Sequence, residues 1–255
     1  MAQLDFNEDV AAELDSVYRR GDHLRRRAIV HEALAAKPGD RVLDAGCGPG
    51  FYVAETLERV GAEGSLVGVD ASPAMLTVAA KRCEGHPNVE FHEGDITALP
   101  VADGDFDRAL SVQVFEYLDD VPAALAELFR ALRPGGRVLI WDVDWATVSW
   151  HSEDPARMER VLRAWDGHLT DTTLPRTLSA QLRAAGFEDV EMEGHAFTTN
   201  AITEETYAGA MVALVAGYVG TDEAQDWLAE QRELAERGES YFACIQVCFT
   251  ATRPG

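Results

Sequence analysis

Residues 42–50, Val-Leu-Asp-Ala-Gly-Cys-Gly-Pro-Gly, form the stretch that decides the fold class of this chain. An apolar run ends at the acid Asp44, glycines then occupy every second position, and a helix is expected over 51–60. Glycine permits a tight turn and a close approach of backbone to ligand, and the first turn of a helix presents free N–H groups. The order strand, glycine loop, helix therefore predicts a ligand-binding turn. Its Gly-x-Gly-x-Gly spacing disfavours a nicotinamide oxidoreductase, whose fingerprint is Gly-x-Gly-x-x-Gly.

The chain around this turn alternates between strand and helix patterns. Short apolar strands are expected at 41–45, 65–70, 89–93, 106–112 and 137–143. Helical stretches separate them, and one begins at Ser72-Pro73, where serine can cap the helix and proline suits its first turn. Such alternation is typical of crossover units in a parallel sheet, with the ligand crevice at the carboxyl ends of the strands. We therefore expect an α/β fold with a doubly wound, mostly parallel sheet.

Polar residues at the ends of three strands suit a nucleoside. Asp70 closes the second strand, and an ionised carboxylate offers two acceptors side by side, as two ribose hydroxyls require. Gly94-Asp95-Ile96 follows the third strand, where a carboxylate and a backbone N–H can meet an adenine edge. Ser111-Val112-Gln113 ends the fourth strand and faces the reacting end of such a ligand. Together with the glycine turn, these residues predict one nucleoside-containing cofactor.

The rest of the chain divides into an N-terminal part and two segments after residue 144. Two helices are expected over 6–36, the second capped by Asp22. Their apolar faces would consist of Phe6, Val10, Leu14 and Val17, and of Leu24, Ala28 and Leu34. Further helices are expected at 155–169, at 177–185 and between 200 and 238, with strands near 190–197 and 241–250. We expect one domain over 1–255, made of N-terminal helices (1–37), a cofactor-binding core (38–144) and two helical insertions that cap the crevice (145–176 and 200–238).

Charge and composition exclude several classes of protein. The chain has 44 acidic residues against 22 lysines and arginines, a formal net charge of −22. Binding to nucleic acids or to anionic membranes needs the opposite charge. No apolar run reaches the roughly 18–20 residues of a membrane span, and the acidic N-terminus is unlike a secretory signal. With four scattered cysteines, these features predict a cytoplasmic protein. They do not distinguish a salt-rich habitat from a genome rich in G and C.

Five motifs carry a resemblance to a known family. They are VLDAGCGPG (42–50), VGVDASPAML (67–76), EGDITALP (93–100), FDRALSVQVFEYL (106–118) and LRPGGRVLI (132–140). As a set they resemble the class I S-adenosylmethionine-dependent methyltransferases, in particular the group similar to ubiquinone and menaquinone biosynthesis methyltransferases. The resemblance covers about residues 40–140 and leaves the last part of the chain without a family-wide signature.

The resemblance implies a Rossmann-like sheet of seven strands with the last antiparallel, S-adenosyl-L-methionine as cofactor and S-adenosyl-L-homocysteine as product. The residues it places at the cofactor are Tyr18, Arg27, Asp44, Gly46, Cys47, Gly48, Asp70, Ala71, Met75, Asp95, Ile96, Ser111 and Gln113. Asp44 and the Ser111 backbone would lie near the amino group, and Asp70 on the ribose. Asp95 and Ile96 would lie at the adenine edge.

Two further positions are compared with the family. Tyr18, followed one to two helical turns later by Arg25 or Arg27, resembles segments that close over the cofactor carboxylate. Glu116-Tyr117 stands where relatives often have Glu-His, which puts a catalytic role at that position in doubt.

The methyl acceptor is expected under the first insertion. Methyl transfer is an in-line displacement, so alignment and exclusion of water can lower much of the barrier without a metal or an enzyme nucleophile. A hydroxyl acceptor would need a general base, for which His168 is the first candidate and His151 the second. These histidines and Trp145 are expected to contact an apolar or aromatic acceptor. No metal site is expected, since Cys244 and Cys248 have no further ligands nearby in the sequence.

The sequence therefore predicts an S-adenosylmethionine-dependent methyltransferase acting on a small molecule, with no nucleic-acid partner and no membrane span. Two alternatives remain. One is a relative that binds the cofactor without methylating, as a cyclase-like or decarboxylating enzyme would, and the other is a sensor of the cofactor. The acceptor, the atom methylated (O, N, C or S) and the oligomeric state stay open, a homodimer being one option.

Overall fold

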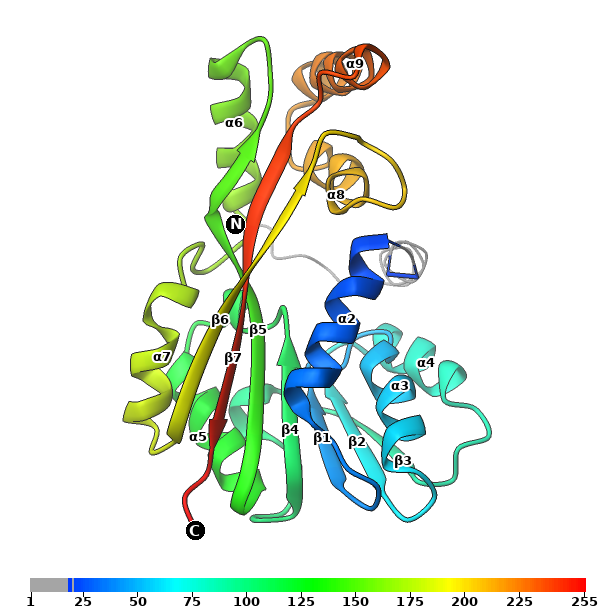
Figure 1. Cartoon of the computed structure of the whole chain (residues 1–255), viewed down its shortest axis with the longest axis vertical. Coiled ribbons are helices and arrows are strands. Elements are labelled where there is room, and N and C mark those ends of the chain that lie inside the picture. Colours follow the sequence, from blue (N-terminus) through cyan, green and yellow to red (C-terminus); the bar gives the residue numbers. More distant parts are fainter. Residues whose placement is uncertain (1–17, 20) are drawn as a thin grey trace.

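The computed structural model describes residues 18, 19 and 21–255. The helix expected before residue 18 lies outside the described residues. The described chain forms a seven-stranded sheet in the order β3-β2-β1-β4-β5-β7-β6, in which β7 alone runs antiparallel to its neighbours (Figure 1). The strands are β1 (Arg41–Ala45), β2 (Ser65–Asp70), β3 (Val89–Glu93), β4 (Phe106–Val112), β5 (Leu132–Trp150), β6 (Glu188–Thr199) and β7 (Phe242–Thr252). The predicted fold class is confirmed, and the first four strands have the predicted bounds.

Helices cover both faces of the sheet. They are α2 (Gly21–Leu34), α3 (Phe51–Val60), α4 (Pro73–Arg82), α5 (Val121–Ala131), α6 (Pro155–Asp166), α7 (Pro175–Ala184), α8 (Tyr207–Ala216) and α9 (Thr221–Arg237), with short 3-10 turns η1 (Ile96–Ala98) and η2 (Phe115–Tyr117). Successive residues of a strand point to opposite faces. Accordingly Val42 belongs to the core shared with α2 and α3, and Leu43 to the core shared with α5 and α7.

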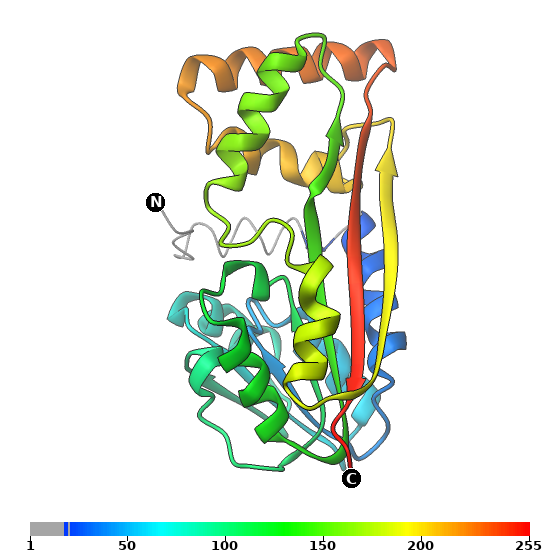
Figure 2. The same ribbon diagram turned by 90° about the vertical axis from the view of Figure 1, so that its left-hand side faces the viewer.

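Strand β5 is longer than the sequence indicated. It was expected to end at 143, but it pairs with β7 again beyond a bulge, with Ser149 opposite Ala243 and Trp150 opposite Phe242. Residues 145–150 therefore continue the sheet rather than begin a helical insertion. The long strands β5, β6 and β7 rise past the short ones, and α6, α8 and α9 lie around their far ends (Figures 1 and 2). We call these three helices, with the strand ends at Trp150 and Phe242, the cap.

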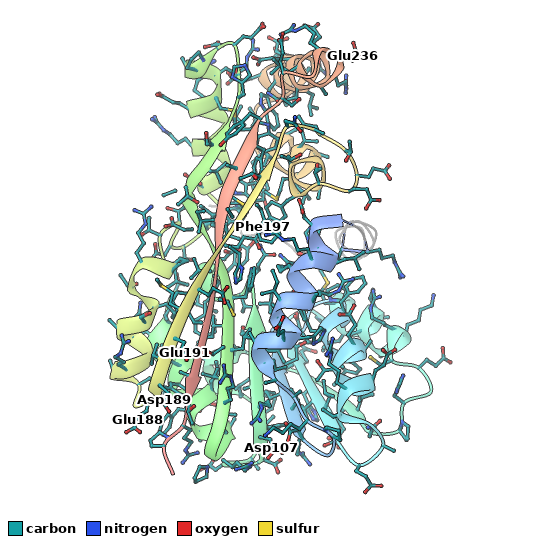
Figure 3. The ribbon with its side chains drawn as sticks, viewed as in Figure 1. Asp107, Glu188, Asp189, Glu191, Phe197 and Glu236 are labelled. Carbon is teal, nitrogen blue, oxygen red and sulfur yellow. The ribbon has the colours of Figure 1, made fainter. Side chains whose placement is uncertain are left out.

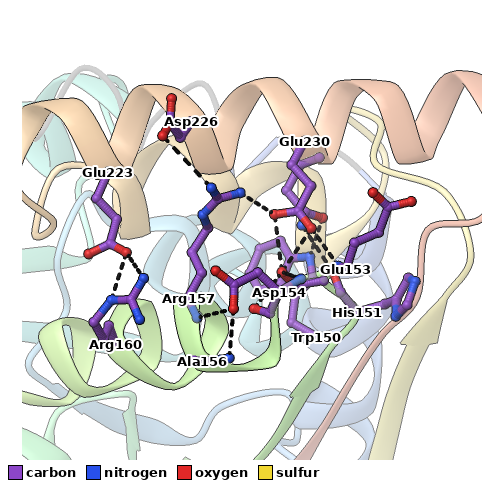
Figure 4. Close-up of polar contacts among 12 residues, drawn as sticks. Trp150, His151, Glu153, Asp154, Ala156, Arg157, Arg160, Glu223, Asp226 and Glu230 are labelled. Atoms are coloured by element: carbon purple, nitrogen blue, oxygen red, sulfur yellow. Dashed lines mark hydrogen bonds and ion pairs between the residues drawn. The ribbon is translucent and has the colours of Figure 1, made fainter.

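The outer end of the cap is closed by ion pairs between α6 and α9 (Figure 4). The Glu230 carboxylate accepts hydrogen bonds from the Ser152 hydroxyl (2.8 Å) and from Arg157 Nη1 (3.0 Å). Next to it, Arg160 pairs with Glu223. The Trp150 indole N–H donates to Gln231 Oε1 (2.9 Å), so β5 is tied to α9 as well. Contacts between segments far apart in the sequence thus hold the cap together.

The edge of the sheet at β6 carries acidic side chains. Glu188, Asp189 and Glu191 are exposed along this strand (Figure 3). Charged side chains on an edge strand oppose pairing with a second sheet. Within the described residues, no helix has both the length and the apolarity that a membrane crossing requires.

Helix α2 buries a polar face, which corrects the predicted apolar one. Leu24 is 49% exposed and Ala28 is exposed as well. The buried side chains are His23, Arg26, Arg27, Val30, His31 and Leu34. Asp22 also differs from prediction, because its carboxylate accepts the backbone N–H of Tyr207 (2.9 Å) at the start of α8. The apolar periodicity misled because this helix packs against polar groups of a pocket and of α3.

Candidate functional site

A pocket of about 600 Å³ opens at the carboxyl ends of the parallel strands. The glycine turn after β1, the segments that follow β2, β3 and β4, and one face of α2 form its walls. The predicted cofactor residues that line it are Tyr18, Arg27, Gly46, Cys47, Gly48, Asp70, Ala71, Met75, Asp95, Ile96 and Gln113. The structure therefore brings together, at one pocket, residues that the sequence spreads from position 18 to position 113.

The glycine turn allows no side chain at its first position. Gly46 has a φ of +82°, and a Cβ there would lie 2.3 Å from Cγ2 of Val114. The N–H groups of Gly46 and Cys47 both donate to the Val69 carbonyl (2.8 and 3.0 Å), which holds the turn against β2. At Gly48 no atom would come within 4 Å of an added Cβ. The turn therefore has no room for a Cβ at Gly46, whereas the space beside Gly48 is open.

Asp70 is held with its carboxylate against this turn. Its Oδ2 accepts the Gly48 N–H (2.8 Å), and its Oδ1 accepts the Ser72 N–H (2.9 Å). Burial raises the pKa of Asp70, and these two N–H bonds oppose the shift. Each carboxylate oxygen can accept a second hydrogen bond. Asp70 can thus offer two adjacent acceptors to a diol.

Asp95 begins the short turn after β3. Its Oδ1 accepts both the backbone N–H (2.8 Å) and the hydroxyl (2.7 Å) of Thr97. Both contacts use the same oxygen, so Oδ2 is available at the pocket edge beside Ile96. This arrangement suits an exocyclic amino group.

Two predicted cofactor residues, Asp44 and Ser111, lie behind the pocket wall. Asp44 is 1% exposed, and its Oδ2 has no hydrogen-bond partner among the described residues. Burial, and then the charge of Asp70, raises the pKa of Asp44 to about 8. A buried acceptor without a donor fits a ligand that brings an ammonium group to the glycine turn. The Ser111 hydroxyl instead donates to the Ala45 carbonyl (2.7 Å) and ties β4 to β1.

Arg26 is a charged pocket residue that the sequence analysis missed. Its Nε donates to the Tyr52 hydroxyl (3.2 Å), its Nη1 to Gln113 Oε1, and its guanidinium lies 5.4 Å from the ring centre of Tyr18. Arg25, one of the two arginines considered, points elsewhere, over the ring of Phe197. The three consecutive arginines at 25–27 indicated that this segment could bind a carboxylate. The orientation of α2 about its own axis decides which of them face the pocket.

Arg27, the other arginine considered, lines the pocket and pairs with Glu55 of α3 (2.7 Å). It also donates to the backbone carbonyl of Tyr18.

Gln113 has a φ of +56°, which is unusual for a residue with a side chain. It bridges Arg26 and the Tyr207 hydroxyl (3.3 Å). Such strain is tolerated where a side chain must be held in one place.

The three residues predicted for the acceptor do not line the pocket. His151 is exposed at the outer end of the cap (Figure 4). Trp145 is 4% exposed and donates its indole N–H to Glu116 Oε2 (2.8 Å). His168 is 7% exposed, and its ring lies 5.8 Å from that of Tyr117, which does line the pocket.

His168 is fixed by its surroundings. Its Nδ1 contacts the Trp165 carbonyl, while its Nε2 has no partner among the described residues. Burial lowers the pKa of His168, so the ring is neutral at pH 7. Since Nδ1 faces a carbonyl, it carries the proton, and Nε2 is left as an acceptor. The catalytic role of His168 remains a prediction.

Comparison with known proteins gives one family. Residues 42–136 match the family model described as a methyltransferase domain. An uncharacterised 37.1 kDa protein of a transposon from Streptomyces fradiae is 38% identical over 145 residues, 57% of this chain and 41% of that protein. A 2-phytyl-1,4-naphtoquinone methyltransferase of Thermosynechococcus vestitus is 32% identical over 167 residues, 60% of this chain and 74% of that enzyme.

Solved structures share the fold. A methyltransferase-like protein from Bacillus halodurans superposes with a TM-score of 0.65 at 20% identity, covering 90% of this chain and 99% of the other. The match to this chain spans between 40% and 56% of the length of the first curated relatives.

Proposed function

Because this chain belongs to the class I S-adenosylmethionine-dependent methyltransferases, we propose that it transfers a methyl group from S-adenosylmethionine to a small molecule. One observation carries the proposal. A single pocket is lined by a glycine turn that excludes a Cβ at Gly46 and by two carboxylates, Asp70 and Asp95, with free acceptor positions. The unpartnered Asp44 carboxyl behind the turn supports the same ligand, which carries an ammonium group.

The pocket residues can divide the cofactor between them. Asp70 would accept the ribose hydroxyls, and Asp95 the adenine amino group. Asp44 would pair with the amino group of the methionine portion, and Arg26 with its carboxylate. The cofactor supplies a methyl group already bound to a good leaving group, so the chain has to align the acceptor and keep water out.

The proposed acceptor has an apolar or aromatic portion. Tyr18 and Tyr117 line the pocket, and His168 lies behind Tyr117 with Tyr218 4.4 Å from its ring. For a hydroxyl acceptor that must lose a proton, we propose His168 as the base, because its Nε2 is unpaired among the described residues. The exposed position of His151 gives it no comparable support.

Binding of S-adenosylhomocysteine, measured by calorimetry, tests the proposal. Asp70→Ala should weaken binding about tenfold to 150-fold, the equivalent of about 1.5–3 kcal/mol for hydrogen bonds to a charged group. Glu236→Ala, at an exposed acid of α9 in the cap (Figure 3), is the control and should leave the affinity unchanged. Equal affinities of the wild type and Asp70→Ala would reject the ribose assignment. Transfer of label from S-adenosylmethionine to a metabolite extract separates a methyltransferase from a relative that only binds the cofactor.

A further inference from the structure

A buried carboxylate, Glu116, lies directly behind the pocket wall. It belongs to η2, and it is 0% exposed, whereas Val114 just before η2 and Tyr117 within η2 line the pocket. Its Oε2 accepts the Trp145 indole N–H (2.8 Å) and faces the Val143 N–H (3.5 Å). Its Oε1 has no hydrogen-bond partner among the described residues, although the Tyr117 side chain also acts on the carboxylate as a hydrogen-bond donor.

The position of this carboxylate is fixed by its own backbone as well. The Glu116 carbonyl accepts the N–H groups of Thr170 (3.0 Å) and Asp171 (3.3 Å). These residues follow α6, whereas Trp145 precedes it, so both ends of the segment 145–171 are tied to Glu116. These contacts hold the Glu116 backbone in place beneath the pocket wall. The unpaired Oε1 can accept a donor that a ligand brings.

The charges around Glu116 indicate what that partner is. A second carboxyl, Asp142, is also 0% exposed, and backbone N–H groups of Val114 and Glu116 face it. The guanidinium of Arg26 acts electrostatically on both carboxyls, and its Nε and Nη1 already donate to Tyr52 and Gln113. Two buried carboxyls thus share one guanidinium. Burial raises the pKa of Glu116 to about 7, so at neutral pH the carboxyl is partly ionised, and a cationic ligand would favour its ionised form.

Tyrosines surround the same place. Burial is the main reason that the pKa values of Tyr18, Tyr117 and Tyr207 are raised, and the nearby charge of Glu116 adds to the shift in each case. Tyr18 and Tyr117 also line the pocket. Aromatic faces attract ammonium groups, and more strongly when water is excluded. A carboxylate oxygen among tyrosines is a suitable site for an amine.

We propose that the methyl acceptor is a primary or secondary amine, bound as its ammonium form by Glu116 Oε1. The inference rests on the proposed function and deepens it. One N–H proton passes to Glu116, which leaves the nitrogen with a lone pair. That lone pair forms the new bond to the methyl carbon while the bond from sulfur to this carbon breaks and its electrons stay on sulfur. The products are a methylated ammonium and a neutral thioether.

The test measures ligand binding to the protein saturated with S-adenosylhomocysteine. The probes are aliphatic and aromatic amines, each paired with the alcohol of the same carbon skeleton. For at least one skeleton, the amine should bind the wild type at least about tenfold more tightly than the alcohol, by the strength of a charged hydrogen bond. Glu116→Gln should remove that preference and leave the affinity for the alcohol unchanged.

Matched variants separate recognition from structure. Glu116→Gln keeps an oxygen for the Trp145 N–H, and Trp145→Phe keeps the carboxylate but removes that donor. Amine preference should survive in Trp145→Phe and disappear in Glu116→Gln, with S-adenosylhomocysteine affinity within about twofold of wild type in both. The preference should also weaken as the pH falls below about 7, where Glu116 is protonated.

Three results would overturn the inference: no amine preferred over its alcohol, a preference retained in Glu116→Gln, or a preference lost equally in Trp145→Phe. Wild-type protein that fails to bind S-adenosylhomocysteine would instead reject the proposed function, and this step is measured first.

Discussion

The sheet around β1 to β4 and the cap place their polar side chains by different means. Around the short strands, Asp70, Asp95 and Gln113 each lie at or just beyond a strand end and reach one pocket. In the cap, the pairs are distant in sequence, as Arg157 and Glu230 are, and exist only once α6 and α9 have packed. The comparison teaches that the pocket depends on local motifs, whereas the cap depends on long-range packing.

The largest effect is expected at the glycine turn. Gly46→Ala introduces a Cβ 2.3 Å from Val114 Cγ2, on a backbone with φ of +82°. Val114 is branched at Cβ and has few rotamers into which it could move. The affinity for S-adenosylhomocysteine should fall at least about 100-fold, since the turn must rearrange. Calorimetry is the measurement.

Gly39→Ala is the control for the backbone strain alone. Gly39 also has a positive φ (+88°), but nothing lies within 4 Å of an added Cβ. The substitution should cost about 1–2 kcal/mol of stability and leave the affinity unchanged. If Gly46→Ala bound the ligand as wild type does, the turn would not be what shapes the pocket.

A smaller effect is expected from pH acting on Asp44. Burial and Asp70 raise the pKa of Asp44 to about 8, so its carboxyl is protonated in the free protein at pH 6. A ligand ammonium requires the carboxylate, and binding must then release a proton. Affinity for S-adenosylhomocysteine should rise by up to about tenfold per pH unit between pH 6 and 8. Asp44→Asn should flatten this dependence, and a wild-type affinity that does not change with pH would reject the pairing.

The smallest effects are expected in the cap. Glu230→Ala removes a 9% exposed carboxylate that accepts hydrogen bonds from Ser152 and Arg157, and should cost about 1–3 kcal/mol. Arg160→Ala removes a solvent-exposed pair with Glu223 and should leave the stability nearly unchanged. Thermal unfolding of the wild type and of the two variants measures these changes in stability. Both variants should bind S-adenosylhomocysteine normally, whereas lost binding would show that the two halves are not separate.

The same carboxylate gives the cap a defined acid response. Burial alone would raise the pKa of Glu230, but hydrogen bonds from Ser152, the Glu153 N–H and Arg157 outweigh it and lower the pKa below the usual 4.5. The contribution to stability is therefore present above pH 4.5 and is lost as the pH falls through the lowered pKa. The difference in stability between wild type and Glu230→Ala, measured by thermal unfolding, should shrink below that pH. If the difference in stability did not change with pH, the ionised carboxylate of Glu230 would not be its cause.

The extent of what sequence could predict follows the same division. The first four strands and eleven of the residues that line the pocket were predicted, because a glycine or an acid at the end of an apolar run marks the end of the strand. Arg26 could not be chosen over its neighbours, since only the packing of α2 sets the rotation of that helix. The extension of β5 to Trp150 was missed because its partner, Phe242, lies far along the chain.

The acceptor side shows a further limit. Trp145 and His168 were expected at the acceptor from their aromatic surroundings, and the structure places both behind the pocket wall. Glu116 was noticed only as the residue before Tyr117, at which the motif departs from the Glu-His of many relatives. Its burial and its contact with Trp145 depend on how the segment 145–171 folds back over η2, which no local pattern records.

The most direct test of the central claim is a crystal structure of the protein with S-adenosylhomocysteine. The account predicts the ribose hydroxyls within hydrogen-bond distance of Asp70, the adenine beside Asp95 and Ile96, and the sulfur toward Gln113. A ligand bound outside this pocket, or one whose ribose does not meet Asp70, would contradict it.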